Sequence, residues 1–392
     1  MDHIVYVDQH VPLSDHYPAS DEKWMPGGHG ANQAVACARL SGLRPREVRK
    51  TSFSRFSDNF SRSHSAEIIE QPDVSVNVYM TGRIGKDDDG KKCKDELYKA
   101  GVDDTGVEPV ENSTVRTGSA DIYIDRHKRQ RIITNPRRAN DHLKPAMFPD
   151  LPDPKPDLLL LQLEIPVETV QYFVTCAYQK QIPILLNAAP IPRANETLLS
   201  LTYARVDHLI CNENQADHYM DRKEKLKDRG DRYLVYKRYF EACDHFHSQG
   251  ARRVVITLAE LGAIASVVNL GPAETNRIIP LDRQRLRRQR HIVDAAVSPG
   301  GVNDTIGGSD TFIGGYAVEI VRQMKLSQSF NIVQAMEFGV KAAAMNIAKE
   351  GSMPGIPMRE EVLATSFHNP VPQAFDFGLN FPNPESGGGQ EK

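Results

Sequence analysis

Apolar and polar positions alternate along the chain in a way that predicts strands and helices in turn. Four short apolar runs are typical of strands buried on both faces of a parallel sheet, at 157–163, 182–186, 206–211 and 253–258. Helical patterns separate them, at 167–180 and across a long charged segment at 215–248. This alternation predicts an open α/β sheet.

The remainder of the chain carries weaker patterns. Strands are predicted at 3–7, 76–84, 115–125 and 130–134, the last two forming a hairpin around residues 126–129. Helices are predicted at 91–100, 311–323 and 331–349. Residues 41–75 show no sustained period and are predicted to be an irregular insertion. The Pro- and Gly-rich residues 371–392 are predicted to be a flexible tail, which leaves one domain at 1–370.

Charge and cysteine content argue against several classes of protein. The 392 residues carry a net charge of −3 at pH 7, so nothing indicates a nucleic-acid or membrane partner. The five cysteines are scattered without metal-binding spacing, which favours reduced thiols in a cytosolic protein over zinc or disulfides. No secretory signal is expected at the N-terminus, and no apolar run approaches the roughly 20 residues of a membrane-spanning helix.

Two glycine-rich turns, far apart in the sequence, each lead into a predicted helix. The first is Pro26-Gly27-Gly28-His29-Gly30-Ala31-Asn32, and the second is Asn303-Asp304-Thr305-Ile306-Gly307-Gly308-Ser309-Asp310-Thr311. Adjacent glycines favour an irregular backbone that can approach a ligand closely. Because a helix N-terminus presents free N–H groups and the positive end of its dipole, the second turn suits an anion.

Asp310 stands where the second of these helices is predicted to begin, and two roles are open to it. As an N-cap, its carboxylate would accept a hydrogen bond from the helix backbone. As a general base beside a bound phosphate, it would accept a proton from the substrate. The turn alone does not decide between the two. Glu164, Asn187 and Asn212 follow predicted strands, at the sheet edge where ligands of open α/β folds bind.

The two turns and the segments between them resemble the ribokinase family of PfkB carbohydrate kinases. Residues 27–36 (Gly-Gly-His-Gly-Ala-Asn-Gln-Ala-Val-Ala) resemble its N-terminal signature, and residues 304–312 its C-terminal one. Further motifs in family order are residues 82–85, 162–166, 186–190, 212–213, 257–258 and 351–362. The resemblance covers about 1–40, 76–215 and 250–365.

The resemblance implies a three-layer fold, in which helices flank a central, mostly parallel sheet. It also implies a small β-sheet lid, from about 2–25 and 113–134, that closes over the sugar and often pairs two subunits. The implied reaction is ATP-dependent phosphorylation of a sugar, most of all D-ribose at O5 to ribose 5-phosphate. Asp310 would be the base, and the amides of Gly307, Gly308 and Ser309 would form the anion hole. Phosphoryl transfer depends on such positioning and charge stabilisation.

Three sets of binding residues follow from the same resemblance. Sugar contacts would come from Asp2, Gly28, His29, Gly30, Ala31, Asn32, Glu164 and Asp310. Nucleotide contacts would come from Asn212, Thr257, Leu258, Ala259, Glu260, Leu261, Gly262 and Ser309. A potassium ion would lie among Asp304, Ile306, Asn346, Lys349, Gly351 and Gly355, and Mg²⁺ would accompany ATP.

The chain departs from the family pattern at and near these sites. A lysine between the glycines is replaced by His29, a glycine before the base by Ser309, and the glutamate of an Asn-x-x-Glu motif by Gln215. Residues 295–302 look like a second insertion. The family's first strand and its Gly-Ser-x-Asn lead-in are missing before Met1. Because that strand lies inside the sheet, we expect its loss to remove a paired, buried element.

Two other functions remain as alternatives to a ribose kinase. One is a non-catalytic or weakly active relative that binds a sugar or a nucleotide, for which Ser309, Gln215 and the missing strand are the motive. The other is a kinase for another sugar or for a nucleoside. We expect the protein in the cytoplasm, with the nucleus as a second compartment.

Overall fold

The computed structural model describes most of the chain. The described residues are 1–7, 19–42, 74, 76–125, 130–134, 138–151, 154–193, 198, 200–224, 226, 229–268 and 288–367. The predicted hairpin turn, the predicted tail and nearly all of the predicted insertion at 41–75 lie outside them. Among the described helices, none is long and apolar enough to cross a membrane.

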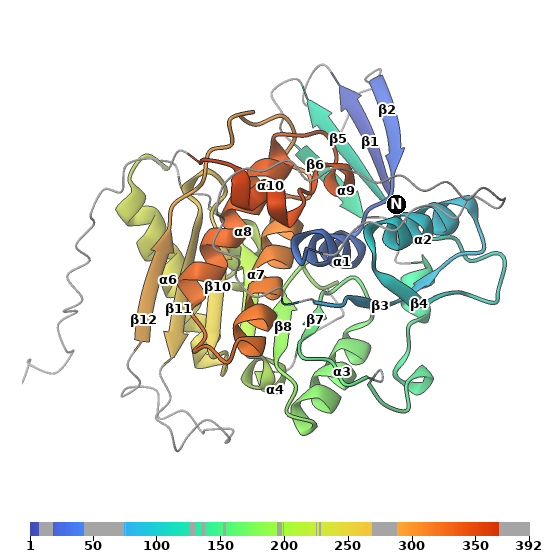
Figure 1. Ribbon diagram of the computed structural model, residues 1–392, viewed down its shortest axis with the longest axis horizontal. Helices are drawn as coiled ribbons and strands as arrows, with labels where there is room; N and C mark the ends of the chain where they lie inside the picture. The colour runs from blue at the N-terminus through green and yellow to red at the C-terminus, as the bar shows by residue number, and fades with distance from the viewer. Residues whose placement is uncertain are drawn as a thin grey trace, which may run out of the picture.

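A six-stranded sheet forms the centre of the molecule (Figure 1), in the order β12-β11-β10-β9-β8-β7. Its strands are β7 (Leu159–Leu161), β8 (Ile184–Asn187), β9 (His208–Asn212), β10 (Arg253–Thr257), β11 (Ala263–Val268) and β12 (Arg288–Val293). The first four run parallel and correspond to the four apolar runs of the sequence, and the last two are antiparallel. The predicted α/β class with a mostly parallel sheet is therefore confirmed.

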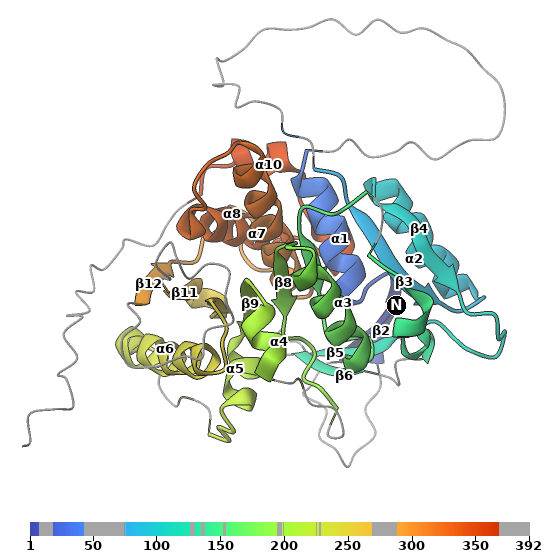
Figure 2. The same ribbon diagram turned by 90° about the horizontal axis from the view of Figure 1, so that it is seen from below.

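Helices cover both faces of this sheet (Figure 2), as a three-layer fold requires. One face carries α1 (His29–Leu40), α7 (Gly308–Lys325) and α8 (Ile332–Ile347), and the other carries α3 (Val167–Gln179), α4 (Ser200–Arg205) and α6 (Arg232–Ser248). Successive strand residues face opposite layers. Ile210 and Val255 pack in the first core, whereas Leu209 and Val254 pack in the second.

Three predicted helices have clearly different limits in the structure. The helix predicted at 91–100 begins three residues earlier, as α2 (Asp88–Ala100). The segment at 215–248 is not one helix but α5 (Glu213–Tyr219) and α6, with Asp231 capping α6 by accepting from the amide of Leu234 at 3.2 Å. α7 begins at Gly308 rather than at residue 311. The second glycine of the pair is therefore the first residue of the helix. Shorter helices that the pattern did not predict, α9 (Ser352–Gly355) and α10 (Arg359–Ala364), follow α8.

Four strands from the predicted lid segments form a second sheet. They are β1 (Asp2–Val7), β2 (Ala19–Met25), β5 (Ala120–Asp125) and β6 (Gln130–Thr134), in the order β2-β1-β5-β6. Ile4, Ile122 and Ile124 bury their side chains together with Ile306, which belongs to the second glycine turn. This small core attaches the four-stranded sheet directly to that turn.

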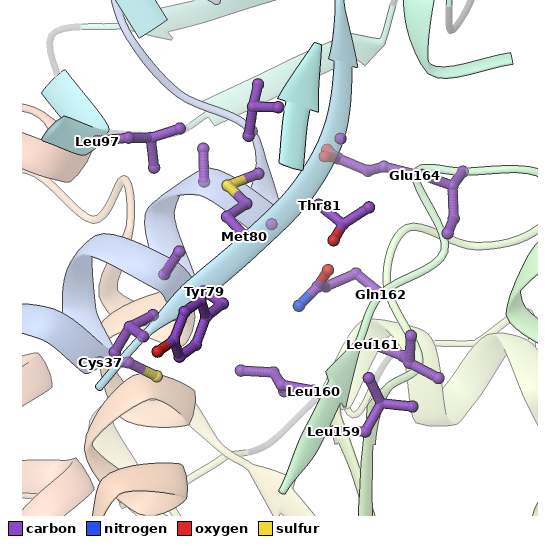
Figure 3. Close-up of a pocket in the computed structure, with 18 of the residues that line it drawn as sticks. Cys37, Tyr79, Met80, Thr81, Leu97, Leu159, Leu160, Leu161, Gln162 and Glu164 are labelled. Carbon is purple, nitrogen blue, oxygen red and sulfur yellow. The ribbon is translucent and has the colours of Figure 1, made fainter. Parts of the chain in front are cut away.

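A third sheet consists of two parallel strands, β3 (Tyr79–Ile84) and β4 (Asp103–Pro109), which α2 (Asp88–Ala100) connects. A gap separates this sheet from the central one. Among the described strands, β3 pairs with β4 alone and β7 with β8 alone. A cavity of about 1050 Å³ lies between them, lined on one side by β3 and on the other by residues 158–162. Figure 3 shows Tyr79 and Met80 on β3 across from Leu160 and Leu161. Among the described strands, β3 and β7 thus face each other across this cavity without pairing.

Candidate active site

Asp310 lies in the first turn of α7, but it does not cap that helix. The N-cap is Gly307, with φ of 81° and no side-chain capping bond. The Asp310 side chain is buried and turns toward α1. There its Oδ1 accepts hydrogen bonds from Nδ1 of His29 at 2.9 Å and Nε2 of Gln33 at 2.8 Å, and its Oδ2 accepts one from Nδ2 of Asn32 at 2.9 Å. The N-cap interpretation is wrong, because the carboxylate faces another helix.

Small residues allow α1 and α7 to approach closely enough for these contacts. A Cβ placed on Gly314 would overlap Cβ of Ala36 and would lie 3.0 Å from the backbone N of Cys37. On the opposite side of α7, a Cβ on Gly339 of α8 would lie 2.8 Å from the carbonyl oxygen of Phe312. Since real Cβ atoms are not found so close, both glycines are required by the packing. The first brings the polar residues of α1 to Asp310.

The charges of this cluster reinforce one another. Burial alone would raise the pKa of Asp310, but the positive charge of His29 and the three hydrogen bonds hold that pKa below its usual value. Burial likewise disfavours a charged His29, yet the Asp310 carboxylate, with Glu164 and Asp2, raises its pKa above the ordinary value. At neutral pH the pair is therefore an ionised carboxylate beside an imidazolium.

Five of the eight predicted sugar residues line one end of the cavity between β3 and β7, whereas His29, Asn32 and Asp310 are not among the residues that line it. Asp2, Gly28, Gly30, Ala31 and Glu164 all border it. Figure 3 shows Gln162 and Glu164 extending into it from the segment after β7. The glycines make room for these side chains. Oε2 of Glu164 lies 3.3 Å from where a Cβ on Gly28 would be, and the Asp2 carboxylate fills the place of a Cβ on Gly27.

Asp2 is the carboxylate most affected by its surroundings. Burial raises its pKa to about 6, with help from the negative charges of Glu164 and Asp310, while the N-terminal amine and His29 oppose the change. These couplings show that Asp2, Glu164, His29 and Asp310 belong to one electrostatic group. The carboxylates of Asp2 and Glu164 and the amide of Gln162 border the cavity. Such groups can hydrogen-bond the adjacent hydroxyls of a polyol.

The predicted anion hole is the start of α7. The positive φ of Gly307 suits glycine, and a Cβ there would lie 2.7 Å from Cα of Ser352. A Cβ on Gly308 would lie 2.9 Å from Cγ2 of Ile347. The side chain of Ser309 is exposed, so replacing a glycine there adds no side chain to the packed interior. The first N–H groups of a helix have no partner within it and attract anions.

The residues predicted to hold a monovalent cation lie together directly behind this turn. The buried carboxylate of Asp304 accepts from the amides of Ile306 and Gly351, both at 3.0 Å. Asn346 is fully buried and donates to the carbonyl of Ser352 at 2.9 Å. Its Oδ1 accepts no hydrogen bond within the described structure, and it lies 3.4 Å from where a Cβ on Gly307 would be.

That unpartnered oxygen is the observation that fits a cation. A buried carbonyl oxygen without a donor is costly unless another group, such as a metal ion, satisfies it. Lys349 and Gly355 both contact Asn346. The amide of Lys349 donates to the carbonyl of Asn346 at 3.0 Å, and a Cβ on Gly355 would lie 2.7 Å from Nδ2 of Asn346. The Lys349 side chain instead pairs with Glu361 at 3.6 Å. Within the described ranges no cluster of three His, Cys, Asp or Glu residues could hold a metal.

The predicted nucleotide residues occupy the carboxyl ends of β9 and β10. Asn212 and Thr257 are paired neighbours there. Asn212 caps α5 by accepting from the amide of Gln215 at 2.9 Å, and Oε1 of Gln215 accepts from the amide of Asn212 at 2.8 Å. Gln215 therefore completes a capping box, as a glutamate would, but it does not carry the negative charge of a glutamate.

A short loop after β10 holds the other predicted nucleotide contacts. Leu258 and Leu261 are buried, whereas Ala259 and Glu260 are exposed. Arg229 fixes this loop, because its guanidinium donates to Oε1 of Glu260 at 2.8 Å and to the carbonyl of Leu258 at 3.2 Å. Gly262 closes the loop with φ of 86° and lies against the carbonyl of Val293, so no larger residue fits.

Three polar residues of the site, Gln33, Gln162 and Ser352, were not predicted as members of it, whereas Asn187 was expected at this edge of the sheet. Gln33 bonds Asp310, Gln162 and Asn187 bond Gln33, and Oγ of Ser352 donates to Oδ1 of Asn32 at 3.1 Å. The available signal for Gln33 was its polar side chain within a helix otherwise rich in small apolar residues. Such a side chain needs partners wherever it is buried.

The comparison with known families agrees with this geometry. The profile of pfkB family carbohydrate kinases matches residues 1–359. The chain belongs to this family. It is therefore a phosphotransferase of the class that acts on hydroxyl groups of sugars.

Individual relatives are less similar but match along their length. The chain is 26% identical to ribokinase from Haemophilus influenzae, over 92% of this chain and 94% of the relative. It is 24% identical to deoxyribokinase from Salmonella typhimurium, with the same coverage. Among solved structures, ribokinase from Giardia lamblia has a TM-score of 0.68 at 20% identity, covering 92% of this chain and 95% of that one. Arabidopsis thaliana ribokinase complexed with ribose and ATP has a TM-score of 0.64 at 19% identity, covering 92% and 94%.

Proposed function

We propose that this carbohydrate kinase phosphorylates D-ribose at O5 with ATP, using Asp310 as the general base. The observation that carries the proposal is the position of the Asp310 carboxylate. It is held ionised by three donors of α1 and lies in the first turn of α7, two residues after Gly308, at which that helix begins. A proton acceptor and a cradle for transferred phosphate thus lie at the same helix end.

In the proposed reaction the chain's own groups bind the sugar, accept its proton and stabilise the phosphate. Asp2 and Glu164 hydrogen-bond the ribose hydroxyls, while O5 faces Asp310. The O5 proton passes to the Asp310 carboxylate as O5 bonds to the γ-phosphorus. The bond from that phosphorus to the bridging oxygen breaks, and ADP leaves. The amides of residues 307–309 bind the oxygens of the phosphoryl group during transfer.

Two metal ions and the nucleotide complete the proposal. ATP would contact Asn212, Thr257 and the loop 258–262, with Mg²⁺ neutralising its phosphates. A potassium ion would be held by Asp304, Oδ1 of Asn346 and main-chain carbonyls. Its contribution is charge and rigidity behind Gly307, because hard cations prefer such oxygen ligands. The four-stranded lid would close over ribose and exclude water.

The substrate assignment is tested by turnover with defined sugars. ADP formation from ATP is measured with ribose, 2-deoxyribose, fructose 6-phosphate and a nucleoside, with Mg²⁺ and K⁺ present. Ribose should give the highest kcat/KM. A higher value for deoxyribose or for the nucleoside would replace ribose and keep the chemistry, whereas binding without turnover on any of them would mean a non-catalytic relative.

The role of Asp310 is tested by Asp310→Asn. General bases typically contribute about a hundred- to ten-thousandfold in rate, so kcat should fall by at least that lower factor. Asp207→Asn is the matched control, because Asp207 is also partly buried and accepts from a backbone amide, that of Ile184 at 3.0 Å, at the opposite end of the sheet. Full activity of Asp310→Asn would refute the base.

A further inference from the structure

Gln33 is a completely buried polar side chain on α1. Neither its amide nitrogen nor its oxygen lacks a partner. Nε2 donates to Oδ1 of Asp310 at 2.8 Å and to Oδ1 of Asn187 at 3.0 Å, and Oε1 accepts from Nε2 of Gln162 at 2.6 Å. A primary amide has two N–H donors, so both are used.

The three partners come from three separate elements. Asp310 lies in the first turn of α7, Asn187 ends β8, and Gln162 follows β7. Asn187 in turn donates from Nδ2 to the carbonyl of Ile210 in β9 at 3.2 Å. Gln33 therefore connects the site to the carboxyl edge of the central sheet.

These bonds also fix the direction in which the amide points. The Ile210 carbonyl accepts only, so it takes the NH₂ of Asn187 and turns the oxygen of Asn187 toward Gln33. That oxygen, like the Asp310 carboxylate, requires a donor. Gln33 must then present its nitrogen to both, and its oxygen is left for the NH₂ of Gln162. If the amide of Gln33 were flipped, its oxygen would face two other acceptors, the oxygens of Asn187 and Asp310. Such contacts between acceptors are unfavourable in a buried site.

The consequence for Asp310 is a difference between its two oxygens. Oδ1 accepts two hydrogen bonds, from Gln33 and from His29, whereas Oδ2 accepts one, from Asn32. A carboxylate oxygen has about two lone-pair positions. Oδ1 is therefore filled by the protein, and Oδ2 retains a position that a substrate hydroxyl can use.

We propose that Gln33 is a positioning residue which, together with His29, occupies Oδ1 of Asp310 and leaves Oδ2 to accept the substrate proton. Gln162 and Asn187 hold Gln33 in the orientation that this requires. The inference rests on the proposed function, since it concerns how Asp310 acts as a base. It adds a residue that is not in contact with the sugar cavity.

The test is Gln33→Met, which keeps the side chain's length and removes its hydrogen bonds. We expect kcat for ribose to fall about tenfold to a hundredfold, the size of losing one hydrogen bond to a charged group, which contributes about 1.5–3 kcal/mol. KM for ribose should change little. The acid limb of the pH profile of kcat/KM should move to higher pH, because a donor that favours ionised Asp310 is lost while His29, Asp2 and Glu164 stay in place.

A matched control separates positioning from simple destabilisation. Gln323 is also buried, lies on the same helix as Asp310, and bonds the main chain of Asn331 through both ends of its amide, at 2.6 and 3.3 Å. Gln323→Met should lower the melting temperature without moving the acid limb. If Gln33→Met behaves in the same way, with kcat and the acid limb unchanged, Gln33 is structural and the proposal is wrong.

Two further measurements keep the proposal testable in every case. If Gln33→Met does not fold, Gln162→Met removes the bond that orients Gln33, and a smaller shift of the acid limb in the same direction is expected; no shift overturns the proposal. If the wild-type protein phosphorylates no sugar, the proposed function fails. The carboxyl ¹³C resonance of Asp310, assigned by its absence in Asp310→Asn, then reports its titration directly, and an unchanged midpoint in Gln33→Met overturns the inference.

Discussion

Nδ1 of His29 lies 2.9 Å from Oδ1 of Asp310, so the first turn of α1 carries the counter-charge of the first turn of α7. The pKa of His29 is raised and that of Asp310 is lowered. The histidine's contribution to stability is complete below its unfolded pKa of about 6.5 and is lost as the pH rises through its folded value. The carboxylate's contribution is present above its unfolded pKa of about 3.9 and is lost in acid.

The pair should therefore stabilise the fold most between about pH 4 and 6.5. We expect His29→Gln to lower the free energy of unfolding by about 1 kcal/mol there, since a third of the histidine side chain is exposed to solvent screening. The loss should shrink at higher pH. Urea unfolding at pH 5.5, 7 and 9 measures it, and a loss that grew with pH would contradict the charged pair.

Asp2 gives a pH dependence of the same sign as His29 and opposite to that of Asp310, because its folded pKa is raised. Its pKa in the folded protein is about 6, above the unfolded value, so the native state binds the proton more tightly between about pH 4 and 6. Stability should fall as the pH rises through this range, because a buried carboxylate becomes charged. In Asp2→Asn this part of the slope should disappear. Denaturant titrations of both proteins between pH 4 and 7 make the comparison, and equal slopes would refute the shift.

The close contact of Gly314 with Ala36 predicts a linked loss of stability and activity. Gly314→Ala forces α1 and α7 apart, at a cost of about 1–3 kcal/mol for overpacking. Because Asn32 and Gln33 then move relative to Asp310, kcat should fall more than tenfold. Gly82→Ala is the matched control, since its nearest neighbour would be an ordinary contact at 3.8 Å from Cε of Met80. Equal effects from both variants would show that the helix contact has no special role.

The unpartnered oxygen of Asn346 predicts a specific effect of potassium. Melting temperatures in KCl, NaCl and choline chloride at equal ionic strength should be highest in KCl. In Asn346→Leu this difference should vanish, because the variant lacks the ligand. An ion effect that survives in the variant would place the cation elsewhere. Melting is the preferred readout, since it does not depend on turnover.

The gap between β3 and β7 predicts that an added strand would stabilise the protein. Met1 borders the cavity and lies at its end beside Asp2. We expect a fusion of six alternating valine and alanine residues before Met1 to raise the melting temperature, because a strand there would be covered on both faces and would pair with two open edges. A Gly-Ser extension of equal length is the control. If the two fusion proteins have the same melting temperature, the edges of β3 and β7 do not pair with an added strand.

The sequence predicted those parts of the fold whose pattern reflects burial on two sides. Strands β7 to β10 appear as apolar runs because helices cover both faces of the sheet. β12 was not predicted, because its Arg288 and Arg290 pair with Asp244 at the sheet's outer edge and break any apolar pattern. The segment at 215–248 was taken for one helix because its charges hide the turn between α5 and α6.

In the candidate site, too, some residues could be predicted from the local sequence pattern and others could not. Residues at strand ends could be expected at one edge, since parallel strands all finish there. The role of Gln33 could not be predicted, because its hydrogen bond to Asp310 joins residues 277 positions apart in the sequence. That bond requires the close packing of α1 against α7 that Gly314 allows. Contacts of this kind depend on how two helices pack, which no local pattern contains.

Ile306 belongs both to the core of the small sheet and to the second glycine turn. Its side chain fills the core beneath β1 and β5, and Gly307 is the next residue of the chain. A displacement of the sheet would therefore act on the turn, because the side chain of Ile306 packs in the core of the sheet. Any ligand that pulls those strands inward would also adjust the amides at the start of α7. The proposed phosphate site and the proposed lid over the sugar would then form in one movement.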